Sequence, residues 1–399
     1  MTAVRPLAVA LALSGTLGAC NGVADPPAPA ALMIAGPVDT AVSIGASFPA
    51  RVEVFDAKGG ALTDYLARYR SLDADILTVS GEGLVTAQAP GVGRIEALLA
   101  SLRDTLRVSV LDGRVMARVA VSGRPFGIAV SADGFAYVTR LDQAGIARLR
   151  LENPAILTTA FTGSVPTGVA VNTAGTAAYV TNQYSQSISV LAVPSGTPLA
   201  TLPTAGSPYP IQVRSAGDYL YYATSLARLY RTTLPDGAVL DSLQLPAIPH
   251  HLLLHPNQQL LYVSTRDGGS VLEVDANTMQ VTRTFETGGR TQALALSPDR
   301  AELYVANEQG SLHVIELGAG RVAASIRLAG GAFGLALGPD GTSLFVGLTT
   351  SGVVQVVNRT TRQVTATIVT GGYPRGIAVH AASETVVVAN EYGWVDLLR

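Results

Sequence analysis

The sequence has almost no cysteine and almost no lysine. Its 399 residues include one cysteine, Cys20, and one lysine, Lys58. A single cysteine allows no disulfide within the chain, so the folded part must be held together by its apolar cores. A chain of this length is long enough to form two such cores.

Positive charge is sparse and scattered. The 27 basic and 29 acidic residues give a net charge of −2, and removal of Arg5 with an N-terminal leader would change this to −2 − 1 = −3. We expect no nucleic-acid partner, because binding through phosphates needs a positively charged patch. The sequence also shows no glycine-rich phosphate loop between a strand and a helix, and no long amphipathic helix.

What the sequence does contain is a repeat of 41 or 42 residues between Arg124 and Arg399. Each copy has a short apolar strand and, about ten residues later, a second one. The first strands start at Gly127, Gly168, Pro210, His251, Ala293, Gly334 and Gly376, and the second at Tyr137, Tyr179, Tyr221, Tyr262, Tyr304, Phe345 and Val387. Two further alternating runs follow in each copy, so the repeat predicts four short strands joined by tight turns.

Four-stranded units at this period predict an all-β fold, with a seven-bladed β-propeller over residues 112–399. The last copy ends at Trp394–Arg399 and is one strand short. The run 114–123, just before the first copy, aligns with the fourth strands of the others. We therefore expect this N-terminal strand to complete the last blade, which would leave no exposed edge.

The ends of the second strands resemble a known repeat. Tyr179-Val-Thr-Asn182 and Tyr304-Val-Ala-Asn307 are similar to the motif of the YVTN-repeat, YncE-like family of seven-bladed propellers, whereas Phe345-Val-Gly-Leu348 has lost the polar end. The resemblance covers about residues 114–399. It implies the fold and no particular ligand, because the motif residues are structural, forming a buried strand and a turn.

Residues 1–20 have the pattern of a lipoprotein signal peptide. Arg5 is followed by the apolar run Leu7–Leu13, which is too short for a transmembrane helix. Leu17-Gly18-Ala19-Cys20 resembles a bacterial lipobox, which implies cleavage before Cys20 and lipid modification of that residue. Asn21 then favours the outer membrane, so we expect a lipid-anchored protein of the bacterial cell envelope. A plain secretion signal with a chance cysteine is the alternative.

The segment between the leader and the repeats predicts a tether and a small β domain. Residues 21–31 are rich in proline and alanine. Residues 32–111 alternate like strands, and their Ser71-x-Asp73 step, Gly83-Leu-Val-Thr-Ala87 and Pro90-Gly91 resemble the bacterial Ig-like (Big) domain, a small β-sandwich. This resemblance implies a spacer or adhesive module.

Propeller ligands usually sit where the channel opens, between the loops that enter the first strands and the loops that join second and third strands. One residue before each first strand is expected to surround this mouth. These ring residues are Phe126, Thr167, Tyr209, His250, Gln292, Phe333 and Arg375. Aromatic faces with a cation and polar groups suit a planar, sugar-like or anionic small ligand or an extended peptide, or else they plug the channel.

The loops between second and third strands should lie on the same face. Their polar and aromatic residues are Arg140, Asp142, Asn182, Gln183, Tyr184, Arg266, Asp267, Asn307, Glu308, Asn390, Glu391 and Tyr392. Most of these suit turns, asparagine above all. We retain Arg140, Tyr184, Arg266 and Tyr392 as binding candidates, with a solvated rim as the alternative.

The sequence predicts no metal site, cofactor or catalytic residue. Its five histidines fall in three repeats, and His250 and His251 should point to opposite faces of a strand. The seven ring residues include no carboxylate for a divalent metal. No serine lies in a Gly-x-Ser-x-Gly motif, and a slip of one residue in phase would exchange the roles of the two histidines.

Three functions remain open. We favour an envelope-anchored binding or scaffold protein whose propeller mouth holds a protein, peptide or glycan. A propeller enzyme (hydrolase, lyase or oxidoreductase) with a channel site is the first alternative, and a bound metal or chromophore would favour it. A structural or adhesive surface protein is the second, favoured if loss of residues 32–111 alone abolished surface attachment.

Overall fold

The computed structural model describes residues 28–35 and 41–399. The expected leader (1–20), the lipidation site Cys20 and most of the tether lie outside the described residues. The all-β fold expected from the sequence is confirmed: apart from strands, the described part has two 3₁₀ turns, Leu141–Gln143 and Ala381–Ser383. Neither turn has the length of a membrane-crossing helix.

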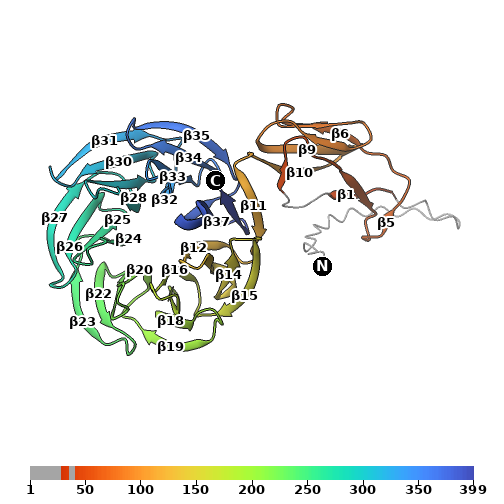
Figure 1. Ribbon diagram of the computed structural model, residues 1–399. Coiled ribbons are helices and arrows are strands. Elements are labelled where there is room, and N and C mark those ends of the chain that lie inside the picture. The colour runs from red at the N-terminus through yellow and green to blue at the C-terminus, as the bar shows by residue number, and fades with distance from the viewer. Residues whose placement is uncertain (1–27, 36–40) are drawn as a thin grey trace.

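From Val115 onward, the described chain forms seven four-stranded antiparallel sheets. We number these ring sheets 1 to 7 along the chain. Their first strands are β12 (Pro125–Val130), β16 (Pro166–Val171), β20 (Pro208–Val213), β24 (Pro249–Leu254), β28 (Thr291–Leu296), β32 (Ala332–Leu337) and β36 (Pro374–His380). Each first strand contacts the next, and β36 contacts β12, so the sheets close a circle around an axis, as Figure 1 shows. This is the arrangement of a β-propeller.

The other strands follow outward from the axis. The second strands are β13 (Phe135–Arg140), β17 (Ala177–Asn182), β21 (Tyr219–Thr224), β25 (Leu260–Thr265), β29 (Glu302–Asn307), β33 (Ser343–Leu348) and β37 (Thr385–Asn390). The third strands are β14 (Gly145–Arg150), β18 (Ser187–Ala192), β22 (Arg228–Thr233), β26 (Ser270–Asp275), β30 (Ser311–Glu316), β34 (Val353–Asn358) and β38 (Trp394–Leu398). The outer strands are β15 (Ala155–Phe161), β19 (Pro198–Pro203), β23 (Val239–Gln244), β27 (Gln280–Glu286), β31 (Arg321–Arg327) and β35 (Gln363–Val369), with β11 (Val115–Ala120) outermost in ring sheet 7.

The core of the ring lies between neighbouring sheets. Leu229 of ring sheet 3, for example, belongs to one buried cluster with Leu261 and Leu272 of ring sheet 4. Each sheet is apolar on both faces, so it buries them only when a neighbour packs on each side. Ring sheet 7 is made from both ends of this part of the chain, because β11 pairs with β38.

Residues 31–111 form a separate N-terminal β module, drawn in orange beside the ring in Figure 1. Its strands are β1 (Ala31–Ala35), β2 (Ala41–Ser43), β3 (Ser47–Pro49), β4 (Arg51–Phe55), β5 (Ala61–Leu62), β6 (Arg68–Ser71), β7 (Leu77–Val79), β8 (Leu84–Ala87), β9 (Gly91–Leu99) and β10 (Leu102–Leu111). They make sheets β1-β4-β5, β2-β10-β9-β6 and β3-β8-β7 around a core that includes Leu77, Val85, Ile95 and Val108.

Candidate functional site

A bulge in every first strand sets the position of the ring residues. In β12, Pro125 pairs with Arg140 and Ile128 with Val138, so β12 has one residue more than β13 over this stretch. The first strands of the other six ring sheets carry a register shift at the same place. A bulge interrupts the alternation of side chains along a strand. The bulge therefore decides which residue of each first strand faces the channel. The sequence pattern does not show where the bulge lies.

In four of the seven first strands the ring residue is followed by a glycine (Gly127, Gly168, Gly334 and Gly376), which is explained by the backbone of the next ring sheet. A Cβ atom on Gly168 would lie 2.5 Å from the carbonyl oxygen of Tyr209, and one on Gly376 would lie 2.6 Å from that of Phe126. No side chain fits there without moving the backbone. Neighbouring first strands therefore approach each other closely at the ring positions.

The threonine of the repeated motif joins two neighbouring ring sheets. The Thr181 hydroxyl accepts a hydrogen bond from the Gly168 N–H (2.8 Å) and donates one to the carbonyl of Tyr209 (2.8 Å). Thr139 makes the same two contacts, with Gly127 (2.7 Å) and Thr167 (3.0 Å). These bonds satisfy backbone groups that the bulge leaves unpaired.

The asparagine of the motif holds the loops of the mouth face together. Asn390 accepts hydrogen bonds from the N–H groups of Tyr373 (2.9 Å) and Tyr392 (3.2 Å) and donates one to the carbonyl of Gly371 (2.8 Å). It thus ties the loop that enters β36 to the turn that leaves β37. Asn307 makes the equivalent contacts in ring sheet 5.

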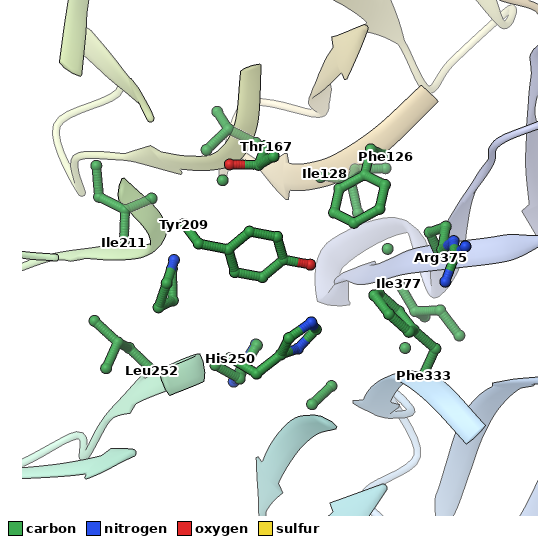
Figure 2. Close-up of a pocket in the computed structure, with 18 of the residues that line it drawn as sticks. Phe126, Ile128, Thr167, Tyr209, Ile211, His250, Leu252, Phe333, Arg375 and Ile377 are labelled. Carbon is green, nitrogen blue, oxygen red and sulfur yellow. The ribbon is translucent and has the colours of Figure 1, made fainter. Parts of the chain in front are cut away.

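Six of the seven ring residues line a cavity of about 160 Å³ at the centre of the ring (Figure 2). They are Phe126, Thr167, Tyr209, His250, Phe333 and Arg375. A second layer of apolar residues lines it further along the first strands: Ile128, Val169, Ile211, Leu252, Leu335 and Ile377. Gln292, the seventh ring residue, is fully buried and turns to Glu308, to which its Nε2 donates a hydrogen bond (3.1 Å).

Four aromatic rings meet across the channel. The centroid of Phe126 lies 6.0 Å from that of Tyr209 and 5.8 Å from that of Phe333, both edge-on. His250 lies 4.6 Å from Tyr209 and 5.2 Å from Phe333. Figure 2 shows the Tyr209 ring extending toward the centre of the cavity. The rings narrow the channel to a small, largely apolar opening.

The two adjacent histidines both line the cavity. The bulge in β24 lies between Pro249 and His251, so strict alternation no longer separates them as the sequence analysis expected. Burial lowers the pKa of His250 well below its ordinary value, helped by the positive charges of Arg266 and Arg375. Burial lowers the pKa of His251 to about 4. Both side chains are therefore neutral at pH 7, and Arg375 is the cation of the ring.

Arg375 is already paired with a carboxylate. Its Nε lies 2.6 Å from Glu391 Oε2, and Arg124 binds the other oxygen of Glu391. The guanidinium also lies 4.5 Å from the centroid of Phe333. Burial alone would raise the pKa of Glu391, but the hydrogen bonds from Arg124 and Arg375 outweigh it and lower that pKa.

Sequence reasoning missed these carboxylates. It interpreted Glu391 and Glu308 as turn residues and did not propose Arg124 or Arg290 as site residues. Glu308 binds Arg266 (2.9 Å) as well as Gln292, and Arg290 lies 3.2 Å from Asp267. The signal that could have found them is positional, because both glutamates directly follow the motif asparagine in their repeats.

The four rim candidates do not line the cavity, and they lie in four different ring sheets. Arg140 donates a hydrogen bond to the carbonyl of Ser122 (3.0 Å), and Arg266 is held by Glu308. Tyr184 is 75% exposed, whereas Tyr392 packs against Tyr373 with a centroid distance of 5.1 Å. The structure therefore does not gather these four residues into one site.

Within residues 28–35 and 41–399, no group of three or more His, Cys, Asp or Glu side chains is placed to hold a metal ion. The mouth presents aromatic surface, hydrogen-bonding groups and Arg375, whose charge is balanced by Glu391. Groups of this kind can hold a bound molecule by contact.

No model of a known protein family matches the chain. It is 37% identical over 76 residues to an uncharacterized protein, YncE, of Salmonella typhimurium, and this stretch spans 19% of the chain and 21% of that relative. The fold is similar to a chain of hydrazine synthase from Kuenenia stuttgartiensis, with a TM-score of 0.64 and 17% identity, over 72% of this chain and 98% of the other. These similarities support a β-propeller fold.

Proposed function

We propose that this protein is an envelope-anchored binding or scaffold protein whose propeller mouth holds a segment of a protein partner. The observation that carries the proposal is the central cavity, where five first strands place four aromatic rings and Arg375 around one opening. The proposal assigns no catalytic step and no cofactor to the chain.

The size of the cavity favours a protein or peptide over a free glycan. A buried apolar cavity of about 150 Å³ holds a molecule the size of benzene, and pockets for larger ligands measure about 300–1,000 Å³. The mouth cavity, about 160 Å³, is matched to one inserted side chain. A partner segment would place that side chain against the four rings and rest the remainder on the surrounding loops.

The charges of the mouth support a partner with an apolar or aromatic side chain. Arg375 and Arg266 are each bound by a glutamate, so an anionic ligand would first have to displace Glu391 or Glu308. The aromatic faces have no such competitor. Arg375 itself covers one face of the Phe333 ring, which leaves the cavity side as the contact surface.

The proposal includes the finer architecture expected from the sequence. Residues 112–399 would be a seven-bladed propeller of the YVTN type, and residues 32–111 an Ig-like spacer domain. The seven ring sheets and the three small sheets of the N-terminal β module support this division. Residues 1–20 would be removed as a signal peptide, and a lipid on Cys20 would attach the protein to the outer membrane.

The test is site-specific photo-crosslinking in the envelope of the source bacterium. A photoreactive phenylalanine analogue replaces Tyr184, which is 75% exposed on the mouth face, or, as the control, Phe161, which is 84% exposed on the outer strand β15. We expect a partner protein to be captured at position 184 and not at 161. Capture of a glycan at 184 would change the assigned occupant.

A second comparison asks whether the aromatic rings hold the partner. Capture from position 184 is repeated with Phe126→Leu/Phe333→Leu, which keeps apolar volume but removes both rings, and with Phe161→Leu/Leu199→Ala on the outer strands. Thermal unfolding checks that each variant is folded. Loss of capture in the first variant alone supports the proposal, whereas equal capture in both means that the rings are a plug.

A further inference from the structure

A second cavity lies where the N-terminal β module meets the ring. It has a volume of about 250 Å³ and is separate from the mouth cavity, with no lining residue in common. Its walls come from β9 and β10 of the module and from three loops of ring sheets 6 and 7. The lining residues are Val92, Arg107, Ser109, Thr349, Thr350, Ser351, Gly352, Gly371, Gly372, Tyr373, Tyr392 and Trp394.

The glycines of the ring loops let the module come close. Gly371 has a φ of +63°, and a Cβ atom there would lie 3.0 Å from the Ser109 hydroxyl of β10. The positive φ favours glycine at this position, and any larger residue would also press on the Ser109 side chain. The cleft depends on this approach, because the module supplies one wall of it and the ring loops the other.

Aromatic surface forms one side of the cleft. Tyr373 and Tyr392 are 41% and 53% exposed, and their rings meet edge-on with centroids 5.1 Å apart. Trp394 lies 6.1 Å beyond Tyr392, and its indole N–H is bound by Asp396. The guanidinium of Arg375 lies 5.8 Å from the Tyr373 ring centroid, and the exposed parts of the two tyrosine rings line the cleft.

Polar groups with no protein partner face the same space. In the described part of the chain, the hydroxyls of Ser109, Thr350 and Ser351 and the guanidinium of Arg107 make no side-chain hydrogen bond or ion pair, and neither do the hydroxyls of Tyr373 and Tyr392. No Asp or Glu lines the cleft. Arg107 is therefore its one charged group, surrounded by unused hydroxyls.

We propose that this cleft binds a single sugar ring that carries a carboxylate. The apolar face of a sugar ring stacks on aromatic side chains, its hydroxyls bond to serine and threonine, and an arginine binds a carboxylate through two parallel hydrogen bonds. The volume suits one ring rather than a longer segment, since pockets for larger ligands start at about 300 Å³. Ligands favour junctions between domains, and this cleft is one.

The test is saturation-transfer NMR on the full chain with four small probes. Glucuronic acid represents the free sugar acid and methyl β-glucuronide the end of a glycan chain. Glucose lacks the carboxylate, and acetate lacks the ring. We expect saturation transfer to glucuronic acid, to methyl β-glucuronide or to both, and little to glucose or acetate. Stronger transfer to glucuronic acid would indicate a free sugar acid as the ligand, and stronger transfer to methyl β-glucuronide the end of a glycan chain.

Two variants locate the binding. Arg107→Gln should weaken glucuronide binding about tenfold or more by removing the charged partner, and Tyr373→Ala should remove the stacking surface. Arg103→Gln, exposed on the same strand β10 and outside the cleft, and Tyr184→Ala, on another ring sheet, are the matched controls.

Loss of the signal in the two cleft variants with retention in both controls supports the proposal. No transfer to either glucuronide, transfer to glucose of equal strength, or retention of binding in Arg107→Gln and Tyr373→Ala each overturns it. Because crosslinking at the mouth is measured separately, failure here leaves the proposed function standing.

Discussion

Arg118 in β11 and Asp396 in β38 bind each other through two parallel contacts, although 278 residues separate them. Nε lies 2.6 Å from Oδ1, and Nη2 lies 3.0 Å from Oδ2. Nη2 also donates to the carbonyl of Thr370 (2.6 Å), and the guanidinium stacks 4.2 Å from the ring centroid of Trp394. The pair is buried where the two ends of the ring meet, so it connects the first strand of the ring to the last.

Arg118→Met should destabilise the protein by about 3–5 kcal/mol, because it leaves the Asp396 carboxylate buried without its partner. Urea denaturation measures the loss. Arg321→Met is the control: its pair with Glu316 is exposed and should contribute at most about 1 kcal/mol. The double variant Arg118→Met/Asp396→Leu should recover much of the loss. If Arg118→Met costs no more than Arg321→Met, the pair does not hold the ring closed.

Gly168→Ala should destabilise the ring by about 1–3 kcal/mol, as expected for an atom forced into a filled space. The added Cβ would lie 2.5 Å from the carbonyl of Tyr209 and 2.8 Å from the Thr181 hydroxyl. Gly81→Ala, whose Cβ would have no neighbour within 4 Å, is the control. Thermal unfolding of both variants decides the matter, and equal melting temperatures would contradict close approach of the first strands.

Asp340 should contribute stability that depends on pH. Burial alone would raise its pKa, but hydrogen bonds from Ser343 and Thr342 lower it to about 2. A carboxyl whose pKa is lower in the folded state stabilises the protein above its unfolded pKa, about 3.9 for Asp, and loses this effect as the pH falls toward the folded value.

Asp340→Asn should therefore be less stable than the wild type at pH 6, and the difference should shrink by pH 2.5. Urea denaturation at both values measures it. The exposed Asp75, which has no side-chain hydrogen bond in the described part of the chain, provides the control Asp75→Asn. A difference between wild type and Asp340→Asn that stays constant with pH would show that the hydrogen bonds do not favour the ionised carboxyl.

Cys20→Ser should release the protein from the membrane, because it removes the residue proposed to carry the lipid. Two acyl chains bind a bilayer far more strongly than one, so loss of the lipid should greatly weaken attachment to the membrane. Detergent phase partition of cell extracts compares the variant with the wild type. Continued partition of Cys20→Ser into the detergent phase would mean that another feature attaches the protein.

The period of 41–42 residues predicted the all-β fold by itself. A sheet of four short strands that is apolar on both faces must find a neighbour on each side, and regular repetition of such sheets leads to a ring. The phase of the repeat also selected Phe126, Tyr209 and Arg375, since residues at equal positions in equal repeats lie at equal distances from the axis.

The contacts between repeats were decided only by the tertiary structure. The bulge at His250 and His251 depends on how two strands pair, and the period is unchanged by it. The pair of Arg124 with Glu391 joins ring sheets 1 and 7, which come from the two ends of the ring. A sequence motif within one repeat does not predict a contact with another repeat.

The cleft beside the ring was still less visible in the sequence. Arg107 and Tyr373 lie in different parts of the fold, and neither the strands of the module nor the repeats of the ring predict how the two are placed. Local pattern determines which strands form and which faces are apolar. The distances between side chains far apart in the chain are fixed only when the ring closes and the module docks beside it.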